Sequence, residues 1–310
     1  MNDGGRPVLK TLGLGKCYHS GLAAKITTVL ESVDLTIYGG EVFGILGANG
    51  AGKSTTLKIL AGLIRPTYGQ AWLFDQPIDD PQSRAKIGFL PDIPAFQDYL
   101  TAEESLLLSG RLAGLSPTLL RSRVDHVLST LGLSAVRQRR LAAFSKGMLQ
   151  RMGLAQALVH DPEVIIFDEP MSGLDPMGRA DVRDLILELK RSGKTIVFSS
   201  HLLHDVELLC DRIGLLRNGR LEIQGNRQEL TRASRSGPVD LVLEGLGEES
   251  MEELRGMSIA FFPETDRVLA TLADSTLLDV VFEFVRRDHA RLVSLQPRTN
   301  LLEPLLGRAG

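Results

Sequence analysis

Cysteine and long apolar runs are what this 310-residue sequence has least of. Its two cysteines, Cys17 and Cys210, are too few for a disulfide scaffold and too far apart for a Cys-x-x-Cys metal clip. No apolar run approaches the ~18 residues that a membrane-spanning helix needs, and residues 1–10 lack the apolar segment of a signal peptide. We therefore expect a chain from a reducing compartment, which meets any membrane from its surface.

An excess of charge of one sign is also missing. The chain carries 35 Lys and Arg against 38 Asp and Glu, a net charge of −3, so no basic face for nucleic acid is expected. Its 43% hydrophobic and 24% charged residues are ordinary globular values and exclude wholesale disorder. The length suffices for two or three domains with real hydrophobic cores.

The apolar pattern predicts strands that alternate with helices. Short apolar runs predict strands at residues 33–37, 42–46, 164–167 and 195–199. Spacings of three and four residues predict helices at 53–64 and 179–191 and a helix-rich stretch at 101–141. Buried strands that alternate with helices are typical of an α/β domain with a mostly parallel sheet.

A polar stretch with Gly and Pro, TRASRSGP at residues 231–238, predicts a domain boundary. We therefore divide the chain into residues 1–230 and 231–310. In the second part we expect strands at 240–243, 259–262, 268–272 and 292–295, a helix after the first strand and a longer one at 276–287. This order predicts a small α+β domain of the ferredoxin-like type, followed by a short helix.

A P-loop pattern, GxxxxGK[ST], occupies residues 47–54 between a predicted strand and a predicted helix. Its glycines let backbone N–H groups and a helix N-terminus surround a phosphate. Lys53 is expected to reach the β- and γ-phosphates, and Ser54 to hold Mg²⁺. The expected nucleotide contacts from this stretch are Gly47, Asn49, Gly50, Ala51, Gly52, Lys53, Ser54 and Thr55.

Two further motifs carry candidate chemistry. Asp168 and Glu169 follow the apolar run at 164–167, which places Asp168 at the metal and Glu169 beside the attacking water. Spacing alone also allows Glu169 to be a surface or helix-start residue. Ser145 and Gly147, in the sequence FSKGM, stand before a predicted helix and suggest a second anion site, although in isolation an ordinary N-cap is the favoured explanation.

Taken in order, these motifs resemble the ATP-binding subunits of ABC transporters over about residues 8–230. Tyr18 stands at the A-loop position and His201 at the switch position. Between them lie the Walker A stretch at 47–54, the Q-loop region at 87–92, the signature at 144–148, Walker B at 164–169 and the D-loop at 172–175. The resemblance implies a P-loop ABC-type fold with a mostly parallel core sheet, an antiparallel β subdomain and a helical subdomain.

The resemblance also implies a site shared between two subunits, which close head to tail on two ATP molecules. Ser145 and Gly147 would contact the γ-phosphate held by Lys53 of the other subunit, and Asp175 would lie at the dimer seam. Tyr18 would stack on adenine, and His201 would bind the γ-phosphate and help hold the attacking water. Taken alone, a tyrosine such as Tyr18 is more often a core or surface residue, and a plain turn aspartate is the alternative for Asp175.

Two positions depart from the family pattern. The signature is FSKGM rather than LSGGQ, a spelling similar to that of drug, antibiotic and polysaccharide exporters whose ATPase and membrane subunits are separate chains. Asp92 stands where the family has Gln. A carboxylate can bind Mg²⁺ directly or through water, so the expected metal set is Ser54, Asp168 and Asp92, with a place just outside the metal shell as the alternative for Asp92.

The expected function is therefore ATP hydrolysis, with ATP and Mg²⁺ bound, that powers a separate integral membrane permease. We expect a homodimer, peripheral on the cytoplasmic face of the membrane and without nucleic acid. Residues 300–306, NLLEPLL, resemble the C-terminal tail of exporter ATPases, which helps join two subunits, so the small domain is expected to serve dimerisation or regulation.

Two alternatives stay open. A soluble ABC ATPase of translation or DNA repair usually has two ATP-binding domains, long coiled coils or zinc-binding cysteines, and none of these is evident in the sequence. Its basic run at 137–140 is more typical of a solvated helix end than of a nucleic-acid patch. A regulator with an inactive site is disfavoured by the presence of Lys53, Asp168, Glu169 and His201 together.

Overall fold

The computed structural model describes residues 5–20, 25–226, 239–264, 267–273 and 277–297. The chain divides into two compact units, residues 1–225 and 226–310. The boundary predicted after residue 230, the segment 300–306 and the short final helix lie outside the described residues.

A six-stranded sheet forms the centre of the first unit, with the strand order β11-β10-β4-β9-β8-β7. Its strands are β4 (Val42–Leu46), β7 (Ile87–Leu90), β8 (Val164–Phe167), β9 (Thr195–Ser200), β10 (Arg212–Arg217) and β11 (Arg220–Asn226). The pairings from β10 through β7 are parallel, and every residue of β4, β8 and β9 is buried. This matches the predicted parallel core, because a parallel sheet is covered on both faces.

A second, antiparallel sheet packs beside it. It contains β1 (Pro7–Ser20), β2 (Lys25–Val33), β3 (Thr36–Tyr38), β5 (Tyr68–Leu73) and β6 (Gln76–Pro77). The single strand predicted at 33–37 is wrong, because β2 ends and β3 begins within it. Between them, Asp34 accepts a hydrogen bond from Gly13 N at 2.6 Å and Leu35 N donates to the Thr11 hydroxyl at 2.9 Å. The apolar pattern continues across this link although the strand does not.

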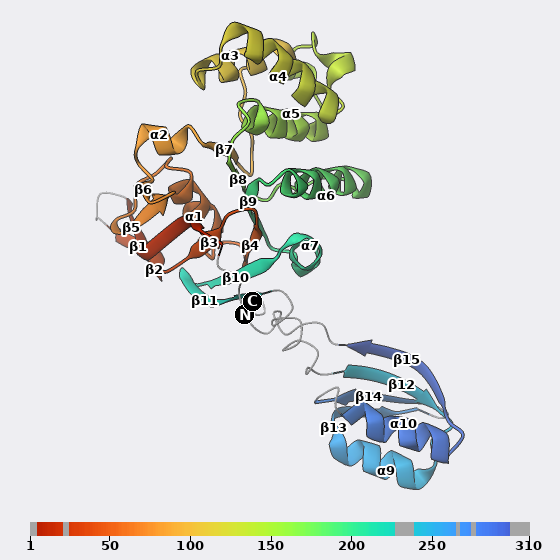
Figure 1. Ribbon diagram of the computed structural model, residues 1–310. Helices are drawn as coiled ribbons and strands as arrows, with labels where there is room; N and C mark the ends of the chain where they lie inside the picture. Colours follow the sequence, from red (N-terminus) through yellow and green to blue (C-terminus); the bar gives the residue numbers. More distant parts are fainter. Residues whose placement is uncertain (1–4, 21–24, 227–238, 265–266, 274–276, 298–310) are drawn as a thin grey trace. The chain divides into compact units, whose positions relative to one another are not determined.

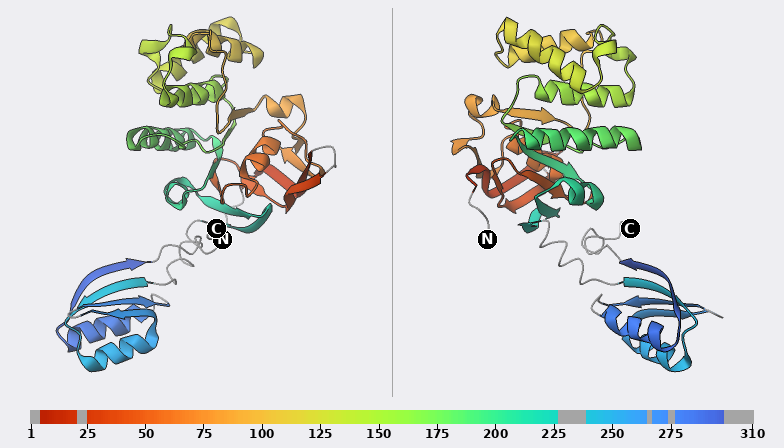
Figure 2. Two further views of the ribbon diagram at one scale, coloured as in Figure 1. Left: turned by 180° about the vertical axis from the view of Figure 1, so that it is seen from behind. Right: turned by 45° about the vertical axis from the view of Figure 1, so that its right-hand side comes forward.

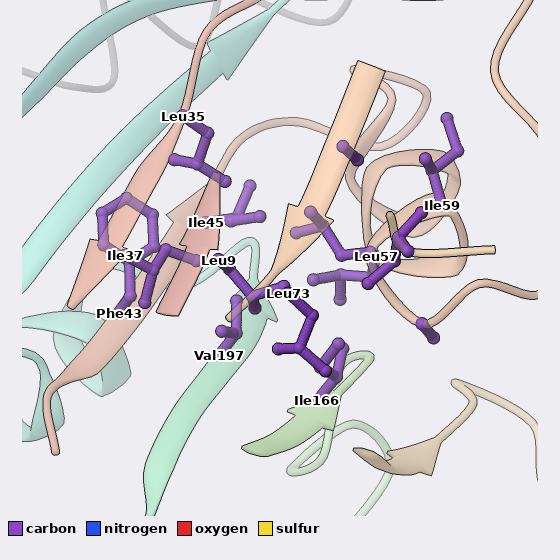
Figure 3. Close-up of a cluster of buried hydrophobic side chains, with 14 of the residues drawn as sticks. Leu9, Leu35, Ile37, Phe43, Ile45, Leu57, Ile59, Leu73, Ile166 and Val197 are labelled. Carbon is purple, nitrogen blue, oxygen red and sulfur yellow. The ribbon is translucent and has the colours of Figure 1, made fainter. Parts of the chain in front are cut away.

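The main hydrophobic core joins both sheets to the helix α1 (Lys53–Leu60) (Figure 3). Leu9 of β1, Ile45 of β4 and Ile166 of β8 are buried in it together with Leu57 of α1. Since β4 and α1 are both held by this core, the loop between them has a defined position. That loop is the P-loop predicted from the sequence.

Helices α3 (Ala102–Leu112), α4 (Pro117–Thr130) and α5 (Lys146–Leu158) gather at one end of this unit (Figures 1 and 2). Helices α3 and α4 confirm the predicted helix-rich stretch at 101–141, and α3 begins with a capping box between Thr101 and Glu104. The basic run at 137–140 follows a short 3₁₀ turn, η1 (Ser134–Val136), and Arg137 pairs with Glu103 at 2.5 Å and with Asp125 at 3.0 Å.

The remaining helices of this unit are α2 (Pro81–Arg84), α6 (Pro176–Arg191) and α7 (Leu203–Leu209). The helix predicted at 179–191 is α6, and it begins three residues earlier. Asp175 accepts a hydrogen bond from Gly178 N at 2.8 Å, and proline stands at the first helical position. Both features are typical of a helix N-terminus.

The second unit is a four-stranded sheet with two helices. Its elements are β12 (Val239–Glu244), α9 (Glu248–Met257), β13 (Ser258–Pro263), β14 (Arg267–Leu272), α10 (Leu278–Arg287) and β15 (Arg291–Pro297). The strand order is β13-β14-β12-β15 and every pairing is antiparallel. This is the ferredoxin-like arrangement that the sequence predicted. Figures 1 and 2 show α9 and α10 on the same face of this sheet.

Candidate nucleotide-binding site

The P-loop connects β4 to α1 in a shape that only small residues allow. A side chain on Gly47 would place its Cβ 2.4 Å from the Leu216 carbonyl oxygen. Gly52 has a φ of +105°, and a Cβ there would lie 2.5 Å from a methyl carbon of Leu30. Residues 48–50 are exposed, so the outer side of the loop is open to a ligand while its inner side is tightly packed.

The N-terminus of α1 opens directly onto this loop. The first backbone hydrogen bond of the helix runs from Thr56 N to Gly52 O at 2.9 Å. The N–H groups of Lys53, Ser54 and Thr55 therefore have no acceptor within the helix. Together with the positive end of the helix dipole, they form an anion-binding site. The sequence prediction for residues 47–55 thus corresponds to one continuous loop and helix terminus.

Lys53 lies at the centre of a network of charges. Its side chain is only 6% exposed, and its ammonium group donates to Gly47 O at 2.7 Å and to Ala48 O at 3.2 Å. The same nitrogen lies 3.2 Å from Glu169 Oε1. The other oxygen of Glu169 lies 2.9 Å from His201 Nδ1. The structure therefore brings the three predicted catalytic residues together.

Asp168 lies beside them and is almost completely buried. Its Oδ1 accepts hydrogen bonds from the Ser54 hydroxyl at 3.1 Å and from the Ser199 hydroxyl at 2.8 Å. Burial raises the pKa of Asp168, the two hydroxyl donors oppose that rise, and the negative charges of Asp92 and Glu169 add to it. A nearby cation would stabilise the ionised carboxylate and offset the penalty of burial.

The donor set around Asp168 fits Mg²⁺. Among the described residues, no group of three or more His, Cys, Asp or Glu is arranged to hold a metal ion by itself. Mg²⁺ is usually held by one or two protein carboxylates with substrate phosphates and water, and Ser54 and Asp168 offer such a partial set. Asp92 is exposed and is connected to Asp168 through its charge. Its place in the metal set stays a prediction.

Glu169 adopts a backbone conformation that is unusual for its residue type. Its φ is +49°, and its N–H donates to the Ser199 hydroxyl at 2.9 Å. Left-handed non-glycine residues of this kind are strained and gather at functional sites. Ser199 therefore orients both acids, a role that the sequence analysis missed. The available signal was a pair of serines that ends an otherwise apolar strand.

The signature residues lie at the start of α5. Ser145 caps the helix by accepting a hydrogen bond from Met148 N at 3.3 Å, and Gly147 lies in its first turn. Gln150, which the sequence analysis also missed, is buried and donates to Pro170 O at 3.0 Å. It thus connects the signature helix to the residue that follows Glu169. A glutamine on a helix with a largely apolar buried surface was the signal.

The predicted residues fall into two groups within one chain. No hydrogen bond or ion pair in the described part of the chain joins Ser145, Gly147 or Asp175 to the Lys53, Asp168 and Glu169 network. Asp175 caps α6, as its turn interpretation allowed. Its place at a dimer seam stays a prediction.

Tyr18 lies near the end of β1 with 43% of its side chain exposed. The ammonium nitrogen of Lys16 lies 5.1 Å from the centre of its ring. The ring is thus available to an aromatic ligand. Its stacking on adenine stays a prediction.

Comparison with known proteins agrees with this geometry. The family described as "ABC transporter" matches residues 30–172. An uncharacterized ABC transporter ATP-binding protein of Nostoc sp. is 46% identical over 226 residues, which cover 72% of this chain and 68% of the relative. This chain belongs to the family of ABC transporter ATP-binding proteins. Another relative, the ABC transporter ATP-binding protein NatA of Bacillus subtilis, is 38% identical and covers 70% of this chain and 90% of its own length.

Solved structures give the same assignment for the fold. An ATP-binding subunit of an ABC transporter superposes with a TM-score of 0.66 and 32% identity, covering 73% of this chain and 92% of its own. A dimeric ATP-binding cassette, solved in a post-hydrolysis state with ADP and phosphate, has a TM-score of 0.65 and 28% identity, covering 71% and 98%. The chain is accordingly an ATP-binding, ATP-hydrolysing subunit of an ABC transporter, and the role in translation or DNA repair is not favoured.

Proposed function

We propose that this ABC subunit powers an exporter as a homodimer bound to a separate integral membrane permease, on the cytoplasmic face of the membrane. Two relatives support export: a bacitracin transport ATP-binding protein of Bacillus licheniformis, 37% identical over 69% of this chain, and a linearmycin resistance ATP-binding protein of Bacillus subtilis, 33% identical over 74%. They cover 68% and 75% of their own lengths. No described helix is long and apolar enough to cross a membrane.

One observation carries the proposed chemistry, the meeting of Lys53, Glu169 and His201 beside Asp168. On nucleotide binding, the Lys53 ammonium would exchange its present acceptors for oxygens of the β- and γ-phosphates. Glu169 would then be free to orient a water molecule and accept its proton as the water oxygen attacks the γ-phosphorus. The bond from that phosphorus to the β–γ bridging oxygen breaks, and ADP and phosphate leave.

Ser54 and Asp168 would hold Mg²⁺, which neutralises phosphate charge when bound. His201, hydrogen-bonded to Glu169 Oε2, would keep the carboxylate oriented and contact the γ-phosphate. Most of this catalysis is positioning and electrostatic stabilisation, as is usual for phosphoryl transfer.

The separation of the signature residues from the Lys53 network supports a shared site. Ser145 and Gly147 at the N-terminus of α5 would form an anion site, and no described hydrogen bond joins them to the Lys53 network. A second copy arranged head to tail would supply the missing phosphate contacts in both directions. A structural relative is a dimeric ATP-binding cassette.

The test is capture of the partner in an ATP-bound state. Tagged Glu169→Gln chain would be expressed in its native host, incubated with ATP and purified from detergent-solubilised membranes. We expect a protein with several membrane spans to co-purify. A Glu169→Gln, Lys53→Ala double variant, which cannot hold the phosphates, serves as the control. Recovery of ribosomal or DNA-repair factors without a membrane protein would refute the transporter role.

A further inference from the structure

The sheet of the second unit has one face that its helices cover and one that they do not (Figures 1 and 2). Alternate residues of β12, namely Val239, Leu241 and Leu243, are buried in the core with α9 and α10. The residues between them point to the opposite face, because side chains alternate along a strand. We call this second surface the open face.

Strand register arranges the open face into three rows. The rows are Arg291, Glu244 and Arg267; Ser294, Val242, Leu269 and Phe262; and Asp240, Thr271 and Ala260. The outer rows are polar, with Arg267 Nε 2.5 Å from Glu244 Oε1 and the Thr271 hydroxyl donating to Asp240 Oδ1 at 2.6 Å. The middle row is largely apolar.

The middle row leaves large apolar side chains in contact with solvent. Phe262 is 64% exposed and Leu269, on a central strand, is 37% exposed. Strands with one face on the core and one in water usually carry polar residues on the outer face. Adjacent exposed apolar residues with a polar border are typical of an interaction surface.

We propose that the open face packs against the open face of a second copy of this chain. The supporting observation is that its rows are self-complementary about a two-fold axis. This axis lies between the two packed sheets, parallel to the strands and midway between β14 and β12. Such an axis places β14 of one copy over β12 of the other, and β13 over β15. The same patch on both copies then forms the contact, as a two-fold interface requires.

This arrangement pairs unlike charges on the two central strands, and at the edge strands Phe262 of one copy lies over Ser294 of the other. Arg267 of one copy faces Glu244 of the other, and Leu269 faces Val242. At the third row, Thr271 faces the carboxylate of Asp240. No row sets like charges against each other, and two sheets packed at about 10 Å in this way resemble an aligned β-sandwich.

The size of the open face indicates that the contact is weak alone. Four strands of six or seven residues present a surface of roughly 400 Å², compared with ~800 Å² per partner in a standard stable interface. Between free chains the contact therefore forms only at high protein concentration. The homodimer proposed above would strengthen it by tethering the two copies. The face-to-face contact goes beyond that proposal, since it requires no nucleotide.

Cysteine cross-linking tests the geometry in the full-length chain without nucleotide. Phe262→Cys and Ser294→Cys chains would be mixed and treated with a short thiol cross-linker. We expect the mixed pair to cross-link more than either variant alone, because β13 faces β15. The unsubstituted chain measures the background from Cys17 and Cys210, and Arg255→Cys on α9 tests the opposite face. Equal linking of Phe262→Cys to itself, or no link above background, would overturn the proposal.

Sedimentation of the nucleotide-free chain tests the energetics. Leu269→Glu places two unpaired carboxylates in the apolar row and should raise the dimer Kd about tenfold or more. Arg255→Glu makes a charge change on the helix-covered side and should leave Kd unchanged. An unaltered Kd for Leu269→Glu would contradict the proposal. Evidence that residues 298–310 or another protein cover the open face would also contradict it.

ATP-dependent dimerisation is measured separately with Glu169→Gln and ATP. If this dimer forms while the nucleotide-free contact is absent, only the face-to-face contact fails. If the nucleotide-free contact forms and the ATP-dependent dimer does not, only the shared nucleotide site fails.

Discussion

The two units differ in whether they bury charged side chains. The first unit puts Lys53 and Asp168 inside the protein and gives each several partners. In the described residues of the second unit, the ion pairs are partly exposed, and Phe262 and Leu269 of the open face meet solvent. Buried charge in the first unit indicates chemistry, and exposed apolar surface in the second indicates association. Substitutions should therefore affect one property at a time.

The largest expected effect is on the charge network. Glu169→Gln keeps the size of the side chain and removes its ability to accept a proton, so ATP hydrolysis should fall about 10²- to 10⁴-fold while ATP still binds. Steady-state phosphate release and nucleotide binding measure the two properties. Glu163→Gln, an exposed residue just before β8, is the control. Hydrolysis by Glu169→Gln at the wild-type rate would show that this carboxylate is not the base.

The next effect should be restricted to the second unit. Phe284, on the buried side of α10, is 3% exposed, and Phe284→Ala should lower the free energy of unfolding of this unit by about 3–5 kcal/mol. Calorimetry would follow its transition, and Glu283→Ala, at an exposed neighbouring position, is the matched control. ATP hydrolysis should persist at temperatures where the second unit has unfolded. Parallel loss of both would show that the two units are not independent.

A smaller effect concerns Asp92. If this carboxylate contributes to Mg²⁺ binding, Asp92→Asn should raise the Mg²⁺ concentration for half-maximal hydrolysis severalfold, because one ligand or charge near the cation is lost. Mg²⁺ titrations of ATPase activity measure this, with Asp98→Asn as an exposed control in the same loop. An unchanged or lower requirement would place Asp92 outside the metal shell.

The smallest effect is on the pH dependence of stability. Burial lowers the pKa of His160, whose Nε2 lies 3.1 Å from Ile87 O, near Arg123, Asp161 and Lys194. As the pH falls below 6.5, this histidine therefore binds a proton in the unfolded chain before it does so in the folded one. The free energy of unfolding decreases in that range, and the stabilising contribution of the neutral side chain is complete above it. Denaturant titrations should show a shallower decrease for His160→Gln. An identical slope would contradict this assignment.

Much of the catalytic unit was predictable because its signals are local. The strand at 164–167 has its predicted bounds, since an apolar run ends there at two carboxylates. The P-loop was equally clear from eight consecutive residues. The start of α6 was placed too late, although Asp175 and the following proline were a readable capping signal.

Other features depend on contacts between distant parts of the chain. Ser199 of β9 forms hydrogen bonds with Asp168 and Glu169, which follow β8. Gln150 of α5 forms a hydrogen bond with Pro170. The open face requires register, because only the pairing of Val242 with Leu269 and of Leu269 with Phe262 brings those side chains into one row. The split of the predicted strand at 33–37 coincides with hydrogen bonds to β1, from Gly13 N to the Asp34 carboxylate and from Leu35 N to the Thr11 hydroxyl.

The ion pair between Lys53 and Glu169 has one more consequence. Since both groups belong to the same chain, the carboxylate acts as a tethered competitor of phosphate, at an effective concentration far above that of a free anion. The affinity measured for ATP therefore includes the cost of displacing this carboxylate from the ammonium group. Removing the carboxylate, as in Glu169→Gln, should therefore lengthen the residence time of the nucleotide, even of an analogue that cannot be hydrolysed. Slow nucleotide release and slow hydrolysis can then be measured separately for the same substitution.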